Sequence, residues 1–278
     1  MTNPNIGWLY YKDYYSGAKY NFQGDSSNEK KEKARQNLTL LLKKNKNILE
    51  EKVNANDTAL LTIPNVSNFT LKTTNPGLLI GSGYNHKIGV EGEFKIGFFF
   101  DHTVGVPLIP ASSVKGLLRS AFPQRNVVGK KQKHQNGKEK FIKQLLSKIN
   151  PLYADINIDH LEQFIFDGIN PNSSHEGDKF LSTYNRIIFY DAIVKKSDDT
   201  IFYEDFITHH KNKLKDPDPI MFLKIKPNVE FIFQFGLKSI KINEIEIKPT
   251  DLEQLFKSIL KILGIGAKTN VGYGALSD

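Results

Sequence analysis

Residues 264–274 have the sequence GIGAKTNVGYG and directly follow an amphipathic helical pattern over 251–263. Four glycines surround a single cation, Lys268. Because glycine has no Cβ, its backbone adopts positive φ easily and approaches a ligand closely, which suits a loop moulded against a phosphate backbone. The alternative is a helix that stops at Gly264 and is followed by a glycine-spaced edge strand. The spacing alone does not decide between the two.

This loop differs from the phosphate-binding loops of nucleotide hydrolases and dehydrogenases. A Walker A loop needs glycine directly before its lysine and another five positions earlier, where this chain has Ala267 and Ile262. A dinucleotide fingerprint would need Gly or Ala at Thr269. Both motifs also follow a strand, whereas this loop follows a helix. Nucleotide hydrolysis therefore has little support.

A second segment of interest lies far upstream, where residues 109–119 have the sequence IPASSVKGLLR. Its proline predicts the start of a short helix, with Ser112 or Ser113 as the N-cap. Apolar residues fall at helical spacing on one face, namely Val114, Leu117, Leu118 and Ala121. Lys115 and Arg119 lie at i and i+4 on the opposite face. Hydroxyls and free N–H groups at a helix start suit a phosphate, but an ordinary capped surface helix has the same spacing.

The composition indicates a globular intracellular protein. The 278 residues are 39% hydrophobic and include no cysteine, which excludes disulfides and thiolate chemistry and fits a reducing compartment. No run reaches the roughly 18 apolar residues that a membrane helix needs, and the N-terminus has no leader pattern. We therefore expect a cytoplasmic location and no membrane partner.

Positive charge is concentrated in one part of the chain. Between residues 111 and 148 there are ten Lys or Arg residues and one acidic residue, Glu139. The whole chain has a formal charge of +8, so the remainder is close to neutral. Such a zone is typical of a protein with a polyanionic partner, nucleic acid first and an anionic membrane second. A solvated lysine-rich loop is the alternative.

Six predicted elements define the fold class. In chain order they are a strand near residue 70, a helix over 114–122, strands over 187–194 and 229–237, a helix over 251–263 and a strand over 272–276. This β-α-β-β-α-β order predicts an α+β protein with a ferredoxin-like (RRM-like) core and large insertions. The sheet face or nearby loops of this fold often carry RNA, but many unrelated functions share it.

The remaining segments are expected to be additions to a single domain over 1–278. Residues 1–66 predict an N-terminal helical extension packed on the core, because apolar residues recur at helical spacing over 27–53. Residues 124–140 are polar and basic, which predicts a mobile insertion that carries Lys130 and Lys131. Further strands are expected around 90–100 and over 220–225, and a capping box over 250–253.

The segments at 109–119 and 264–274 together resemble the paired signature of the RAMP superfamily, the ferredoxin-like RNA-binding proteins of CRISPR effector complexes. Within that family, residues 208–210 (THH) and 216–223 (DPDPIMFL), with the Phe-rich strand after them, look most like subunit six of the type III-B Cmr complex. The likeness extends over most of the chain from about Trp8 onward. Ala111 and Asn270 depart from the pattern, since many relatives have Gly and a basic residue there.

The resemblance implies a non-catalytic subunit of an antiviral ribonucleoprotein that needs no cofactor or metal. It would bind the CRISPR guide RNA near its 3′ end, cap the backbone filament, touch other Cmr or RAMP subunits, and meet target RNA indirectly. The RNA-binding residues implied by the two motifs are Ser112, Ser113, Lys115, Arg119, Gly266, Lys268, Thr269 and Asn270. Lys130 and Lys131 of the basic insertion are added as further contacts, and two distant helix ends are expected to form one cationic cradle.

Two other function classes stay open at this point. A metal-dependent RAMP endoribonuclease that cuts target RNA or guide precursor would use a loop aspartate, and Asp101 beside His102 is the candidate. The other histidines, His86, His134, His160, His175, His209 and His210, show no partner pattern, and the last two are most simply a packing or interface pair. A pure assembly protein would bind partner subunits without protecting RNA.

Overall fold

The computed structural model describes residues 5–19, 25–81, 85–86, 88–124, 132–173, 179–208 and 219–278, with the backbone alone for 132–134. The longer helices are α2 (Ser27–Leu49), α3 (Ala55–Leu61), α4 (Ala111–Ser120), α5 (Gln132–Ile149) and α7 (Pro249–Leu263). The strands are β1 (Ser67–Thr73), β2 (Leu108–Ile109), β3 (Ile188–Phe189), β4 (Ala192–Val194), β5 (Phe202–Thr208), β6 (Pro219–Ile225), β7 (Glu230–Gly236), β8 (Ile240–Ile242), β9 (Ile245–Ile247) and β10 (Leu276–Ser277). Short helical turns include α1 (Ile6–Trp8), η1 (Leu9–Asp13), η2 (Pro151–Asp155), α6 (Ile158–Glu162), η3 (Gln163–Asp167) and η6 (Thr269–Val271).

The centre of the molecule is an antiparallel sheet with strand order β10-β1-β7-β4-β2, in which β3 also pairs with β7. Strands β1 and β7 pair along most of their length, from Ser67 opposite Phe235 to Lys72 opposite Glu230. Alternate side chains of β7 face the core because side chains of a strand alternate between its two faces. Phe231, Phe233 and Phe235 are accordingly all fully buried.

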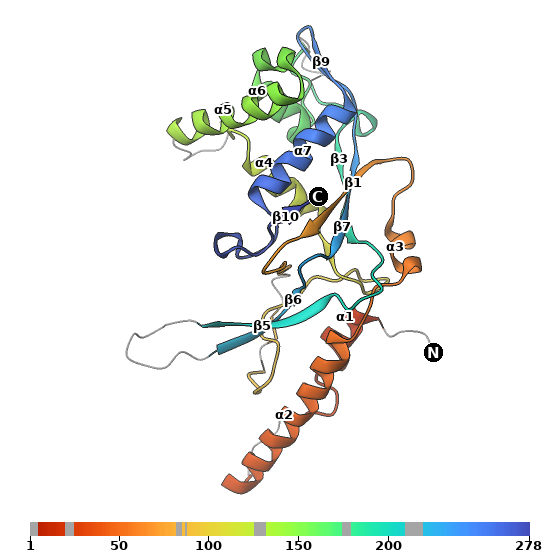
Figure 1. Ribbon diagram of the computed structural model, residues 1–278, viewed down its shortest axis with the longest axis vertical. Helices are drawn as coiled ribbons and strands as arrows, with labels where there is room; N and C mark the ends of the chain where they lie inside the picture. Colours follow the sequence, from red (N-terminus) through yellow and green to blue (C-terminus); the bar gives the residue numbers. More distant parts are fainter. Residues whose placement is uncertain are drawn as a thin grey trace.

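Helix α7 covers this aromatic face of the sheet (Figure 1). Its apolar residues are buried, and the ring of Phe256 lies 5.2 Å from that of Phe235 and 5.9 Å from that of Phe189. The helix is longer than predicted, because Pro249 occupies the first helical turn and Lys248 is the N-cap. The capping box expected over 250–253 is therefore wrong: Thr250 lies inside the helix.

Three of the predicted strands differ from the structure. The strand over 187–194 is divided at Tyr190 and Asp191 into β3 and β4, which both pair with β7. The strand over 272–276 is reduced to β10, because Gly272 and Gly274 have positive φ values of 96° and 75° that interrupt an extended chain. Around 90–100 only an isolated bridge from Phe100 to Pro107 forms.

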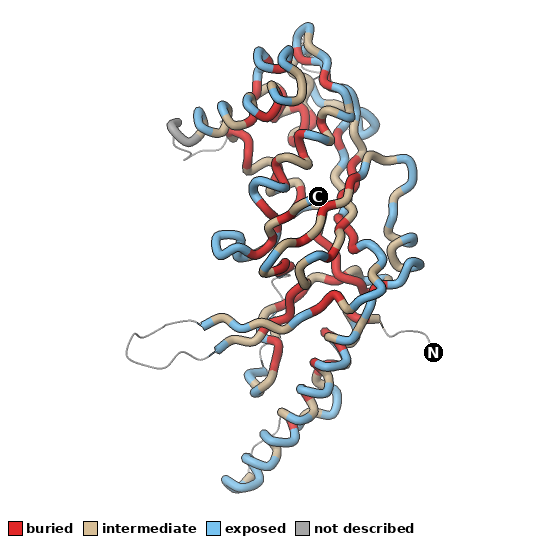
Figure 2. Tube along the Cα trace, viewed as in Figure 1, coloured by how far each residue is buried: buried red, intermediate tan, exposed pale blue. Residues whose placement is uncertain are grey.

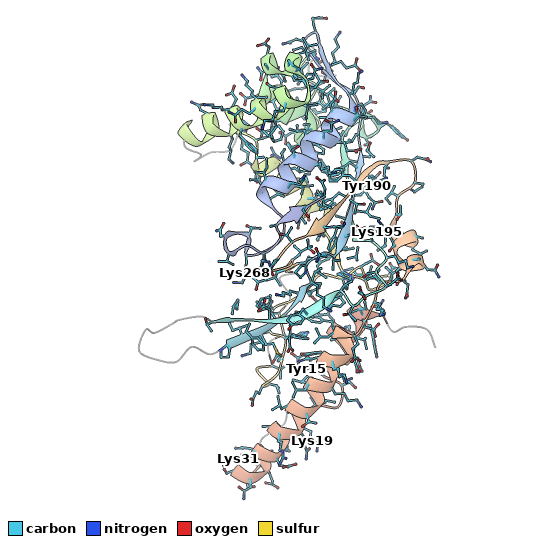
Figure 3. The ribbon with its side chains drawn as sticks, in the orientation of Figure 1. Tyr15, Lys19, Lys31, Tyr190, Lys195 and Lys268 are labelled. Atoms are coloured by element: carbon cyan, nitrogen blue, oxygen red, sulfur yellow. The ribbon has the colours of Figure 1, made fainter. Side chains whose placement is uncertain are left out.

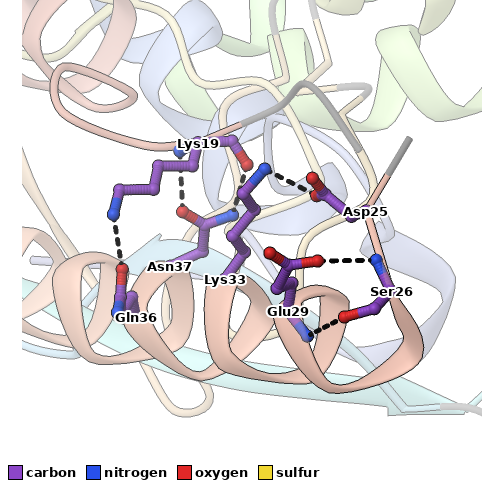
Figure 4. A network of polar contacts seen from close by, with 7 residues as sticks. All are labelled: Lys19, Asp25, Ser26, Glu29, Lys33, Gln36 and Asn37. Carbon is purple, nitrogen blue, oxygen red and sulfur yellow. Dashed lines mark hydrogen bonds and ion pairs between the residues drawn. The ribbon is translucent and has the colours of Figure 1, made fainter. Parts of the chain in front are cut away.

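In the N-terminal region, helix α2 covers most of the stretch over 27–53 in which a helix was expected. Helix α2 begins with a capping box between Ser26 and Glu29, and the amide of Asn37 exchanges two hydrogen bonds with the backbone of Lys19 (Figure 4). Its C-terminal half packs on the body through Leu41 and Ile48, whereas its N-terminal half projects and is exposed (Figure 2). Helix α2 is thus attached to the body mainly by its C-terminal half.

Strands β5 and β6 form a hairpin that leaves the body on a different side from α2 (Figure 1). The prediction of a strand over 220–225 is confirmed by β6, but its partner β5 was not predicted, because the sequence FYEDFIT lacks clean alternation. Residues 209–218, with His209 and His210, lie outside the described residues.

Helix α5 contains part of the segment 124–140 that was predicted to be a basic insertion. It begins at Gln132, so 132–140 are helical and not a loop as predicted. Lys130 and Lys131 lie outside the described residues. Within the described part of the chain, no helix combines the length and apolar character needed to cross a membrane.

Candidate nucleic-acid interface

The base of the glycine loop is closed by backbone hydrogen bonds. Ile265 N–H donates to Gly274 O at 2.8 Å, and Gly274 N–H donates in turn to Gly77 O at 2.8 Å. Ala267 N–H donates to Leu79 O at 2.9 Å. These contacts attach the loop to the segment that follows β1, and they leave its tip at the surface.

Two glycines are required for this closure. A Cβ on Gly274, whose φ is +75°, would lie 1.8 Å from Ile265 O, and one on Gly266, whose φ is +96°, would lie 2.6 Å from Leu79 O. The close approach that glycine permits is therefore an approach to the chain's own backbone. Glycine content by itself does not establish a phosphate site here.

The exposed tip, residues 268–271, is the part available to a ligand. Lys268, Thr269 and Asn270 are exposed, and Lys268 stands in the left-handed region with φ +60° (Figure 3). The N–H groups of 268–270 and the Lys268 ammonium have no partner among the residues that the structure describes. Successive unpaired N–H groups beside a cation form a donor set that suits an oxyanion such as a phosphate.

The start of helix α4 differs from the prediction. The N-cap is Pro110, and neither Ser112 nor Ser113 caps the helix. Instead the carboxylate of Asp191 accepts a hydrogen bond from Ala111 N–H at 2.6 Å. Since a carboxylate at a helix N-terminus already satisfies the positive end of the dipole, this end of α4 is not an open phosphate seat.

The two segments nevertheless meet in space. One depression of about 430 Å³ is lined by both of them and by the chain after β1: Ile80, Gly81, Ile109, Ser113, Leu117, Ser120, Ile265, Gly266 and Ala267. Ser113 and Gly266, both exposed, contribute from α4 and from the loop. The expected meeting of distant helix ends is thus present at this depression.

The cations of α4 do not take part in that meeting. At about 100° per residue, Lys115 and Arg119 lie roughly 160° and 120° around the helix from Ser113. Arg119 Nη2 lies 2.8 Å from Asp167 Oδ1, and its Nε lies 3.9 Å from Glu162 Oε1. Lys115 Nζ lies 5.7 Å from the ring centroid of Phe189. The single cationic cradle of Arg119 with Lys268 is therefore not formed, because acidic residues on α6 and η3 engage the arginine.

A network that the sequence did not reveal ties the loop to the β5–β6 hairpin. Tyr273 Oη donates to Asp205 Oδ2 at 2.6 Å, and Lys224 Nζ donates to the same oxygen at 2.6 Å. The lysine is 8% exposed and lies 5.6 Å from the ring centroids of both Tyr203 and Tyr273. This network was missed because Asp205 lies on β5, the strand that was not predicted.

The network also shifts two pKa values. Partial burial acts to raise the pKa of Asp205, but the hydrogen bonds from Lys224 and Tyr273 outweigh it and hold that pKa below its ordinary 3.8. Burial, and then the bond to Asp205, raise the pKa of Tyr273 to about 12. At neutral pH the pair is therefore a carboxylate and a phenol, the combination that bonds most strongly.

The candidate nuclease residues have structural partners. Asp101 Oδ1 accepts hydrogen bonds from Thr103 N–H and Val104 N–H, each at 2.7 Å, and so closes a turn. His86 is stacked on Tyr10 and Tyr14 at 4.5 and 4.6 Å, and burial lowers its pKa. Among the described residues, no three His, Asp or Glu side chains are arranged to hold a metal ion.

Comparison with known proteins identifies the family. The model of the RAMP superfamily matches residues 70–277, so the chain belongs to this superfamily. Comparison with curated proteins gives no significant match. Two similar solved structures are a type III-B Cmr-beta complex bound to cognate target RNA (22% identity, TM-score 0.47, 93% of this chain and 75% of that chain) and Cmr6 from Pyrococcus furiosus (21% identity, TM-score 0.39, 78% and 99%). A third is a Csm-crRNA-target RNA ternary complex of type III-A (19% identity, TM-score 0.26, 56% and 43%).

The closure of the loop leads to a prediction about two glycines. Gly274→Ala should lower the free energy of unfolding by about 2 kcal/mol or more, because the new Cβ combines positive φ with a backbone clash. Gly116→Ala is the matched control: it lies within α4 with open space around it, and should raise stability by about 0.5–1 kcal/mol. Urea unfolding measures both. A neutral Gly274→Ala would contradict the proposed closure.

The hairpin network leads to a prediction about pH. Asp205→Asn should lower the free energy of unfolding by about 2 kcal/mol at pH 7, because Lys224 loses its counter-ion. The pKa of Asp205 is lower in the folded protein than its ordinary value of 3.8. The stability difference from wild type should therefore be full above pH 3.8 and should disappear as the pH falls through the folded-state pKa of Asp205. Urea unfolding of both proteins across this range tests it. The exposed Asp198→Asn should show no such pH-dependent loss, and identical behaviour of the two variants would refute the network.

Proposed function

We propose that this RAMP protein is a non-catalytic RNA-binding subunit of a type III-B (Cmr) CRISPR effector complex. The observation that carries the proposal is the exposed loop tip, where unpaired N–H groups and Lys268 stand beside a depression shared with α4. Phosphate recognition by backbone donors and one cation gives affinity without base readout. Such binding suits a guide strand whose sequence varies.

The particular place in the complex is also part of the proposal. The subunit binds the guide RNA near its 3′ end, caps the backbone filament, contacts neighbouring RAMP subunits and meets target RNA through them. Support comes from the two sequence motifs at 109–119 and 264–274, which resemble the superfamily signature. A cytoplasmic location follows from this role.

We further propose that the central sheet is a ferredoxin-like core. Strands β10, β1, β7 and β4 lie in this spatial order with antiparallel neighbours. In chain order these strands alternate with α4 and α7 as β1-α4-β4-β7-α7-β10. Strand β2 adds to the edge beside β4, and the β5–β6 hairpin is an insertion between β4 and β7.

The hydrogen bonds of Asp101 support the proposal that the subunit is not catalytic. Its carboxylate oxygen Oδ1 accepts two backbone N–H bonds and stabilises a turn, so a structural role accounts for this residue. A nuclease role would require the same carboxylate to bind a metal ion. The two roles make different predictions for cleavage in the presence of magnesium.

Lys268→Gln should weaken RNA binding and flatten its salt dependence. Loss of one phosphate contact on a single strand lowers the slope of log K against log salt by about 0.7. Binding of a labelled RNA of about 16 nucleotides is measured by fluorescence anisotropy at several salt concentrations. Lys31→Gln is the control, because it removes the same charge at the far end of α2 (Figure 3).

Two results would contradict the proposal. An unchanged slope in Lys268→Gln would remove the loop tip from the RNA site. Magnesium-dependent cleavage of the same RNA that disappears in Asp101→Asn would establish the nuclease instead. Arg119→Gln should leave the slope unchanged, because its guanidinium is already engaged by Asp167 and Glu162.

A further inference from the structure

We propose that the depression between α4 and the glycine loop receives a nucleobase of the bound RNA strand. The inference rests on the proposed RNA-binding function and assigns a ligand class to a site that phosphate contacts alone leave unused. Ile80, Ile109 and Ile265 are buried and form its apolar floor, and Leu117 and Ala267 are half-buried at its wall.

The size of the depression fits a single nucleoside unit. Its volume of about 430 Å³ lies near the lower end of the range for small-molecule sites, about 300–1,000 Å³. The half-buried walls at Leu117 and Ala267 keep some apolar surface in contact with water, and a flat ring would cover it, since burial of apolar area is favourable by about 25 cal/mol per Å². A phosphate alone is too polar to cover these walls.

The position of the loop tip connects the two parts of one nucleotide. Ala267 lines the depression, and Lys268, the next residue, belongs to the donor set at the tip. In a nucleotide, the base and the phosphate are held at a short distance by one ribose. A strand whose phosphate lies on 268–270 therefore brings its base to the opening of the depression.

The rim provides polar groups for a base edge or a ribose hydroxyl. Ser113 is exposed on the rim, and its hydroxyl has no partner among the described residues. The hydroxyl of Ser120 donates to Leu117 O at 2.6 Å and keeps its lone pairs as acceptors. Hydroxyls both donate and accept, and the walls are aliphatic, so every base is accepted with little discrimination.

The test compares two RNAs with the same sugar-phosphate chain, one with bases and one abasic throughout. Wild-type protein should bind the abasic strand about tenfold more weakly, the effect of leaving roughly 55 Å² of apolar contact area exposed to water at about 25 cal/mol per Å². Ser113→Leu fills part of the depression. It should therefore reduce the ratio of the two affinities, that for the RNA with bases divided by that for the abasic RNA. Ser182→Leu is the control, because it makes the same change at an exposed serine that does not line the depression and lies outside both motifs.

The outcomes separate this inference from the proposed function. A wild-type ratio near one, together with a salt slope that depends on Lys268, would overturn the base site and keep phosphate binding. Equal ratios in Ser113→Leu and Ser182→Leu would place base contacts elsewhere and also overturn it. Loss of RNA binding altogether, or a slope independent of Lys268, would reject the proposed function itself. The wild-type comparison requires no variant to fold.

Discussion

The hydrogen bond from Ile265 N–H to Gly274 O closes the glycine loop, and the rest of the candidate interface depends on it. Because the same closure attaches the loop to Gly77 and Leu79, the end of α7 is held against the chain that follows β1. The tip thereby follows directly on the loop residues that share a depression with α4. Through Tyr273 and Asp205 the same loop is also linked to the middle of strand β5 in the β5–β6 hairpin.

The basic zone shows why charge counted along a chain overestimates charge available to a ligand. Arg119 is engaged by Asp167, Lys143 lies 3.1 Å from Glu139, and Lys138 Nζ donates to Ser120 O at 2.6 Å. Arg119 connects α4 to η3, Lys138 connects α5 to α4, and Lys143 pairs within α5. Lys268 lies outside the zone, and its ammonium has no partner among the residues that the structure describes. An RNA site of this kind relies on positioned backbone donors more than on net charge.

Periodic patterns predicted the elements that form the core, including β7, α4 and α7, because burial selects residues at spacings of two or of three to four. The predictions were wrong where a contact between residues far apart in the sequence determines the local structure. Asp191, in the link between β3 and β4, caps α4, and Glu162 engages Arg119, although neither is near its partner in sequence. Asp205 was overlooked for the same reason. The glycines were noticed, but their role in closing the loop required the positions of Gly77 and Leu79.

The central claim is that backbone N–H groups of 268–270 bind RNA phosphates. Amide hydrogen exchange of the protein, measured with and without single-stranded RNA, tests it most directly. The account predicts slower exchange at 268–270 on RNA binding and little change at 265 and 274, whose N–H groups are already bonded. Saturating RNA that leaves the tip amides unprotected while it protects α2 or the hairpin would contradict it.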